Sequence, residues 1–120
     1  MGLLTNIVVA IVALLHVYFL VLEMFLWDTP FGRRTFGLTP EFSAASKTLA
    51  ANQGLYNGFL AAGLFWGLWI GGHDGWHVQL FFLACVVVAG IYGGYSVNRR
   101  IFFVQAVPAI IALILLHLPR

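Results

Sequence analysis

The sequence predicts an all-α integral membrane protein, a single domain of four transmembrane helices with both termini outside the cytoplasm. Three observations predict this fold class. First, 62% of the 120 residues are hydrophobic and 8% are charged, whereas soluble domains carry about 25% charged residues. Second, four segments hold the roughly 20 apolar residues that a helix needs to cross a bilayer. Third, the basic residues gather in alternate connections between these segments.

The first predicted span covers residues 3–27. No Lys or Arg precedes this apolar stretch, and no small-x-small cleavage site closes it. We therefore expect a retained helix and not a cleaved signal peptide. Trp27 and Trp76 stand at span ends, where aromatic side chains favour the membrane interface.

The second predicted span covers residues 48–71 and follows the one long connection, a cytoplasmic loop over 28–47. Within that loop, Thr39-Pro40-Glu41 has the pattern of a helix start, with a Thr cap, a Pro in the first turn and an acid beside it. This pattern predicts that the helix begins near Pro40, before the span itself. Gly54, Gly58 and Ala61 share one face of this helix, roughly opposite Asn52 and Tyr56, and small residues at such spacing allow close packing in lipid.

The third and fourth predicted spans cover residues 77–97 and 100–118. The connection between them, Asn98-Arg99-Arg100, is so short that the two helices must be antiparallel neighbours. Five basic residues fall on one side of the predicted membrane and Arg120 alone on the other. The five are Arg33, Arg34, Lys47, Arg99 and Arg100. The positive-inside rule therefore places both termini outside the cytoplasm of an inner (plasma) membrane.

Eight polar side chains within the spans fall in one layer. At 1.5 Å per residue, these eight lie roughly 5–10 Å below the cytoplasmic interface. The layer consists of Glu23, Asn52, Gln53, Tyr56, Asn57, Tyr92, Tyr95 and Gln105. His16, Glu23 and Trp27 share a stripe of the first helix, with His16 about 10 Å deeper. The arrangement predicts a polar pocket open to the cytoplasmic leaflet.

Acid–base chemistry is one use of such a pocket. We predict Glu23, His16 and Tyr92 as catalytic residues, because an intramembrane acid and a histidine can carry protons and a phenol can donate to an oxyanion. The other side chains are predicted to bind the ligand; these are Trp27, Asn52, Gln53, Tyr56, Asn57, Tyr95 and Gln105. The structural alternative stays open, since buried amides and phenols also hydrogen-bond helices to one another.

Other sites carry weaker signals. His73, Asp74, His77 and His117 lie near the outer end, where they form either a metal site or a polar turn; we predict no metal and no cofactor. The single Cys85 excludes an intrachain disulfide and a cysteine-based metal site. A formal charge of +2 without a basic patch argues against nucleic acid.

The residues around the polar groups resemble a known bacterial family, that of domain of unknown function 1304. The resemblance covers nearly the whole chain, and its most specific run is Ala51-Asn52-Gln53-Gly54-Leu55-Tyr56-Asn57-Gly58. Further parts of the likeness are Leu15-His16-Val17, Leu22-Glu23-Met24, Phe36-Gly37-Leu38-Thr39-Pro40, Ile91-Tyr92-Gly93, and Gln105 with Pro108. It implies a polytopic bacterial membrane protein of this length and no particular activity.

Three function classes stay open. The first, which we favour, binds a small lipophilic or amphipathic molecule, with isomerase-like proton transfer as the fitting chemistry; whether the chain is an enzyme is left undecided. The second is a proton-coupled small-molecule transporter that uses Glu23. The third is a structural subunit, since the remaining glycine faces would serve a homo-oligomer or a larger membrane partner equally well.

Overall fold

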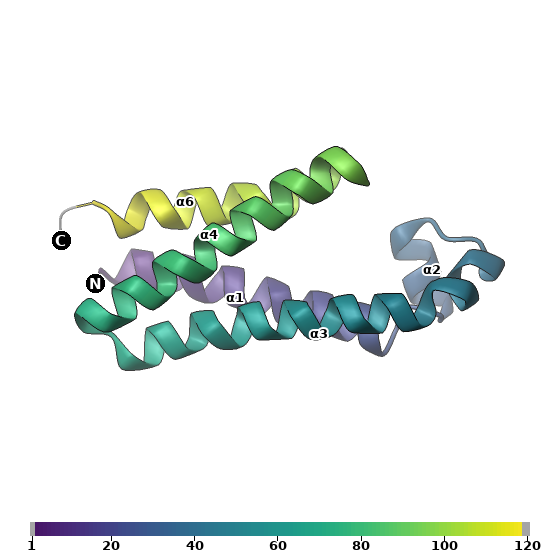
Figure 1. Cartoon of the computed structure of the whole chain (residues 1–120), viewed down its shortest axis with the longest axis horizontal. Coiled ribbons are helices and arrows are strands. Elements are labelled where there is room, and N and C mark those ends of the chain that lie inside the picture. The colour runs from purple at the N-terminus through teal and green to yellow at the C-terminus, as the bar shows by residue number, and fades with distance from the viewer. Residues whose placement is uncertain (1, 119–120) are drawn as a thin grey trace. The chain divides into compact units, whose positions relative to one another are not determined.

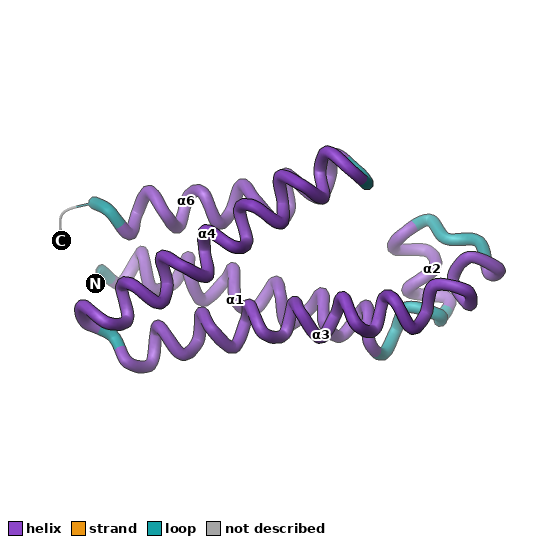
Figure 2. Tube along the Cα trace, in the orientation of Figure 1, coloured by secondary structure: helices purple, strands orange, loops and turns teal. Residues whose placement is uncertain are grey.

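A computed structural model describes residues 2–118, and every regular element within them is a helix (Figures 1 and 2). The all-α prediction is confirmed. The elements are α1 (Leu3–Met24), α2 (Pro30–Phe36), α3 (Pro40–Ile70), α4 (Gly72–Ser96), α5 (Arg99–Ile101), the π-helical segment η1 (Phe102–Ala106) and α6 (Val107–Leu116).

Three helical stretches within residues 2–118 are long and apolar enough to cross a membrane: Leu3–Met24, Gly72–Ser96 and Arg99–Leu116. The apolar character of these helices indicates a membrane protein. Helix α3 is longer than these stretches but less apolar, because it carries amides such as Asn52 and several glycines. The four-span count and the orientation of the termini stay predictions, and Arg120, used for that orientation, lies outside the described residues.

The chain divides into two compact units. Unit 1 comprises residues 1–14 and 60–120, and unit 2 comprises residues 15–59. Helices α1 and α3 contribute residues to both. Each unit is described by itself below.

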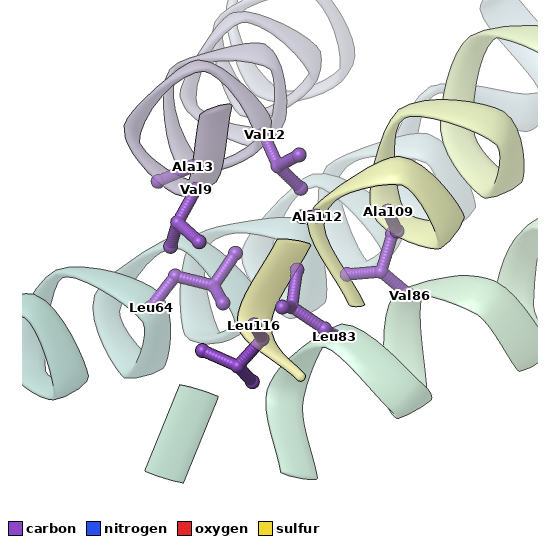
Figure 3. Packing of buried hydrophobic residues seen from close by; sticks show 9 residues of the cluster. All are labelled: Val9, Val12, Ala13, Leu64, Leu83, Val86, Ala109, Ala112 and Leu116. Atoms are coloured by element: carbon purple, nitrogen blue, oxygen red, sulfur yellow. The ribbon is translucent and has the colours of Figure 1, made fainter. Parts of the chain in front are cut away.

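Unit 1 has an apolar core built from α1, α3, α4 and α6. Figure 3 shows nine buried residues of this core, among them Val9, Leu64, Leu83 and Ala109. Glycines let the helices come close: a Cβ on Gly75 would lie 2.5 Å from the carbonyl oxygen of Gly67 in α3. Such contacts have no room for a side chain, so the apolar core depends on small residues at its crossings.

The turn before α4 and the start of α3 both depend on residue types that are recognisable in the sequence. The turn from α3 into α4 is made by Gly71 and Gly72, whose φ angles of 57° and 62° suit glycine and strain other residues. At the start of α3, Thr39 Oγ1 accepts a hydrogen bond from the backbone N–H of Phe42 at 3.1 Å. The helix does begin at Pro40, as its start pattern predicts.

Candidate functional site

Unit 2 brings the last turns of α1 against the middle of α3. The approach is close because Gly54 has no side chain: a Cβ there would lie 2.7 Å from Cγ of Met24 and 3.2 Å from the carbonyl oxygen of Leu20. One turn further along α3, Gly58 meets only the side chain of Leu20. The glycine face predicted from the sequence is thus the face that α3 turns toward α1.

A carboxyl and an amide meet at this crossing. Nδ2 of Asn57 donates a hydrogen bond to Oε1 of Glu23 across 2.5 Å. Asn57 is 5% exposed, and Glu23 is half-buried. The bond uses one of the two carboxyl oxygens of Glu23 and one of the two polar atoms of the Asn57 amide. The pair can therefore receive one further polar group, and its carboxyl can exchange a proton with that group.

A polar cap follows Glu23 directly in the sequence. Asp28 Oδ1 accepts from the Ser43 hydroxyl at 2.8 Å and from Nη1 of Arg33 at 3.0 Å. These interactions, the Ser43 hydrogen bond first, hold the pKa of Asp28 below its ordinary value. Trp27 Nε1 donates to the Ser46 hydroxyl at 3.0 Å. The cap thus ties the end of α1 to the first turns of α3 beside the Glu23–Asn57 pair.

The cap is completed by α2, a short helix that the sequence analysis did not anticipate. The Thr29 hydroxyl accepts from the backbone N–H of Gly32 at 3.1 Å and donates to the carbonyl oxygen of Leu26 at 2.6 Å. Gly32 lies so close to the preceding chain that a Cβ there would overlap that same carbonyl oxygen. Thr29 followed by Pro30 is a cap followed by a proline in the first turn, and this signal could have revealed the helix.

Several predicted site residues of unit 2 lie elsewhere on its helices. His16 is fully buried and meets Phe19 edge to face, with ring centroids 5.2 Å apart. Asn52 and Gln53 are exposed, and Tyr56 is 56% exposed. Of the three amides predicted for this helix, the structure brings Asn57 to Glu23. A ligand role for the others stays a prediction.

The remaining predicted site residues belong to unit 1. Tyr92 and Tyr95 are 70% and 90% exposed. Gln105 is half-buried and lies in η1, where the backbone N–H of Val107 bonds the carbonyl oxygen of Phe102. Pro108 just beyond has no N–H to donate, and such a proline favours a local departure from α-helical bonding. Their roles as catalytic or binding residues are likewise untested predictions.

Two histidines of unit 1, His77 and His117, pack against the indole of Trp76. The ring of Trp76 meets His77 and His117 edge to face at centroid distances of 5.0 and 5.2 Å. Nδ1 of His77 bonds the carbonyl oxygen of His73, and Nδ1 of His117 bonds that of Leu113. Within residues 2–118, no group of three or more His, Cys, Asp or Glu side chains is arranged to hold a metal ion.

Comparison with known proteins gives a family and no activity. The family model described as "Protein of unknown function (DUF1304)" matches residues 10–117. A relative from Lactococcus lactis subsp. lactis (strain IL1403), described as "Uncharacterized protein YpaA", is 34% identical over 116 residues, which are 95% of this chain and 97% of the relative. No solved structure matches the chain.

Proposed function

The chain belongs to the DUF1304 family, and from this premise we propose that it is a four-span membrane protein that binds the polar end of a small lipophilic molecule at Glu23 and Asn57. The observation that carries this proposal is the hydrogen bond between these two side chains at a helix crossing. Ionisable side chains inside membrane segments are costly and usually mark functional sites.

The chemistry of the pair suggests the class of ligand. Leu20 and Met24 of α1 lie beside Gly54 and Gly58 at the same helix crossing, so a ligand bound there would be apolar over most of its surface. Oε2 of Glu23 and Oδ1 of Asn57 would accept from a hydroxyl, and a protonated Glu23 would donate to a carbonyl. Glu23 lies one residue before the end of α1. A molecule dissolved in the adjacent membrane leaflet would therefore reach it without entering water.

Proton transfer is the reaction that these groups fit. Glu23 would take a proton from one position of the bound molecule and return it to another, so that a double bond moves and no co-reactant is consumed. Asn57 would hold the carboxyl in place through the bond that it already donates. His16 lies seven residues before Glu23 on the same helix. In the proposed orientation it would be two turns deeper in the membrane and would serve as a second proton carrier.

The orientation that we propose puts this site in the cytoplasmic half of an inner membrane. The five basic residues of the 28–47 and 98–100 connections support it, because positively charged connections remain in the cytoplasm. Both termini would then lie outside the cytoplasm. A fixed orientation also argues against an antiparallel dimer.

The proposal is tested by mass spectrometry of small molecules that copurify with the protein. We expect one lipophile to be retained by the wild type and lost from Glu23→Gln, because an amide cannot exchange a proton and changes the pattern of hydrogen bonds. Glu41→Gln is the matched control, since Glu41 is an exposed acid at the start of α3. Identical profiles for all three proteins would rule the site out.

A second assay distinguishes proton-coupled transport through Glu23 from binding or isomerisation of a ligand at Glu23. In proteoliposomes, a proton-coupled transporter would move protons when an amphipathic substrate is added, and Glu23→Gln would abolish that movement. A protein that binds or isomerises the lipophile would leave the proton gradient unchanged while still losing its ligand in this variant.

A further inference from the structure

Gln79 of α4 is a buried amide in unit 1 that has no protein partner for either of its polar atoms. It is 0% exposed, and among residues 2–118 neither Nε2 nor Oε1 of Gln79 meets a hydrogen-bond partner. Its Cγ packs on Gly67 of α3, where a Cβ would lie 2.7 Å away. Nearly all buried polar groups in folded proteins bond either to the protein or to ordered water. The side chain of Gln79 thus calls for a further polar molecule.

A second amide, that of Asn6 in α1, shares this property at nearly the same height. Its Oδ1 is buried and has no hydrogen-bond partner within residues 2–118. Thr5 Oγ1 and Trp76 Nε1 donate to the carbonyl oxygens of the last two residues of α6, at 3.4 and 2.9 Å. Asn6 follows Thr5 by one residue and Gln79 follows Trp76 by three. At 1.5 Å per residue, the two amides therefore lie within about one helical turn of each other in height.

Both amides stand on the helix faces that build the core of unit 1. Asn6 precedes Val9 by three residues and Gln79 precedes Leu83 by four, so each lies one turn before a core residue on the same side of its helix. Val9 and Leu83 belong to one buried cluster (Figure 3). The buried polar atoms of the two amides therefore form the layer of the core that follows its apolar part.

This layer belongs to unit 1 alone. Its residues fall within 1–14 and 60–120. On α3, unit 2 ends at Phe59, eight residues before Gly67 and thus about 12 Å away along the helix. The layer can therefore be described without reference to unit 2.

We propose that this layer is an internal water-binding site, in which water joins Gln79 of α4 to Asn6 of α1. The three atoms offer two acceptors and one donor group, and water complements them because it both donates and accepts. Asp74, the charged residue nearest to Gln79 in the sequence, is exposed, so no carboxylate is present to balance a cation. Only a small neutral molecule fits beside a fully buried amide, and buried water typically makes such bonds.

The water would link α1 to α4 at the end of unit 1 where Thr5 and Trp76 bond the end of α6. A bond through water is nearly as favourable as a direct one. The inference depends neither on a ligand at Glu23 nor on the orientation of the chain in the membrane.

X-ray radiolysis in isotopically labelled water tests the proposal, because radicals formed from bound water oxidise the side chains beside it. In the wild type, Leu83 should take up the label although it is 0% exposed. Gln79→Met keeps the unbranched chain that packs on Gly67 but removes both polar atoms, and it should lower the labelling of Leu83 several-fold. Val86, likewise 0% exposed but two turns from Gln79, is the control and should stay unlabelled. Labelling of Leu83 no greater than that of Val86, or unchanged in Gln79→Met, would overturn the proposal.

A double-mutant cycle gives a second, independent measure. Asn6→Leu and Gln79→Met should each lower the ratio of folded to unfolded protein about three- to tenfold, because each removes one partner of the shared water. The double variant should lose little more than either single variant, since the same water is lost once. Fully additive losses, or a Gln79→Met protein at least as stable as the wild type, would contradict the shared water.

Discussion

Glu23 and Asn57, 34 residues apart in the sequence, share a hydrogen bond of 2.5 Å between α1 and α3. The bond lies at a crossing that Gly54 makes close, and the backbone of α1 leaves little space beside it. The polar pair and the small residue thus depend on each other. Glu23 reaches Asn57 because the helices touch, and the bond in turn holds the two helices at this register.

Replacing Asn57 with Leu should destabilise the protein by about 1–3 kcal/mol, because Leu has nearly the same size but leaves Oε1 of Glu23 without its donor. Unfolding of the detergent-solubilised protein measures the change. Gln53→Leu is the control, since Gln53 is exposed on the same helix. In the double variant Glu23→Leu, Asn57→Leu, much of the loss should be recovered; purely additive effects would mean that the two side chains are not coupled.

Adding a methyl group at Gly54 should cost more stability than adding one at Gly58. The Cβ at position 54 would meet the backbone of α1 as well as Glu23, whereas at position 58 it would meet only the movable end of Leu20. We expect Gly54→Ala to cost about 1–3 kcal/mol, as overpacking does, and Gly58→Ala clearly less. Thermal unfolding of the two variants side by side gives the comparison, and equal losses would refute the role assigned to backbone contact.

Much of this crossing could be predicted from the sequence. The long apolar segments gave the all-α fold class, and Thr39-Pro40-Glu41 gave the start of α3, because caps and prolines act within one turn of chain. The spacing of Gly54 and Gly58 also identified the face that packs, with Asn52 and Tyr56 opposite. These features are local, so one helix contains all the information needed.

The partner of Glu23 could not be chosen from depth alone. Asn52, Gln53 and Asn57 lie within two turns of one another, and all fall in the predicted polar layer. What distinguishes Asn57 is its angular position three residues after Gly54, on the side that faces α1. Depth places a residue along the helix, whereas contact depends on rotation around it. Helix α2 has seven residues, too few to show a hydrophobic period, so Thr29-Pro30 at its start is the local signal that could have predicted it.

Acid should weaken the cap through Asp28. Its pKa in the folded protein is lowered, chiefly by the Ser43 hydroxyl and then by Arg33, from an ordinary value of 3.8. A lowered pKa adds stability that is fully present above the ordinary value and is lost as the pH falls through the lowered one. Ser43→Ala should therefore be less stable than the wild type near pH 6, and the gap should narrow below about pH 3.8.

Denaturant unfolding of both proteins across this pH range provides the check. Thr48→Ala, an exposed change on the same helix, should show no such pH-dependent gap. A gap between the wild type and Ser43→Ala that stays constant down to pH 2 would show that the hydroxyl acts through packing and not through the Asp28 carboxylate.

Sided labelling should place the two ends of α3 on opposite faces of the membrane. In a Cys85→Ser background, a cysteine at Thr35 in α2 should react with an impermeant maleimide only after the membrane is opened, because Arg33 and Arg34 beside it keep this connection in the cytoplasm. A cysteine at His73, just after α3, should react in intact cells. Labelling of both positions from the same side would show that α3 does not cross, and would leave the three more apolar helical stretches as the spans.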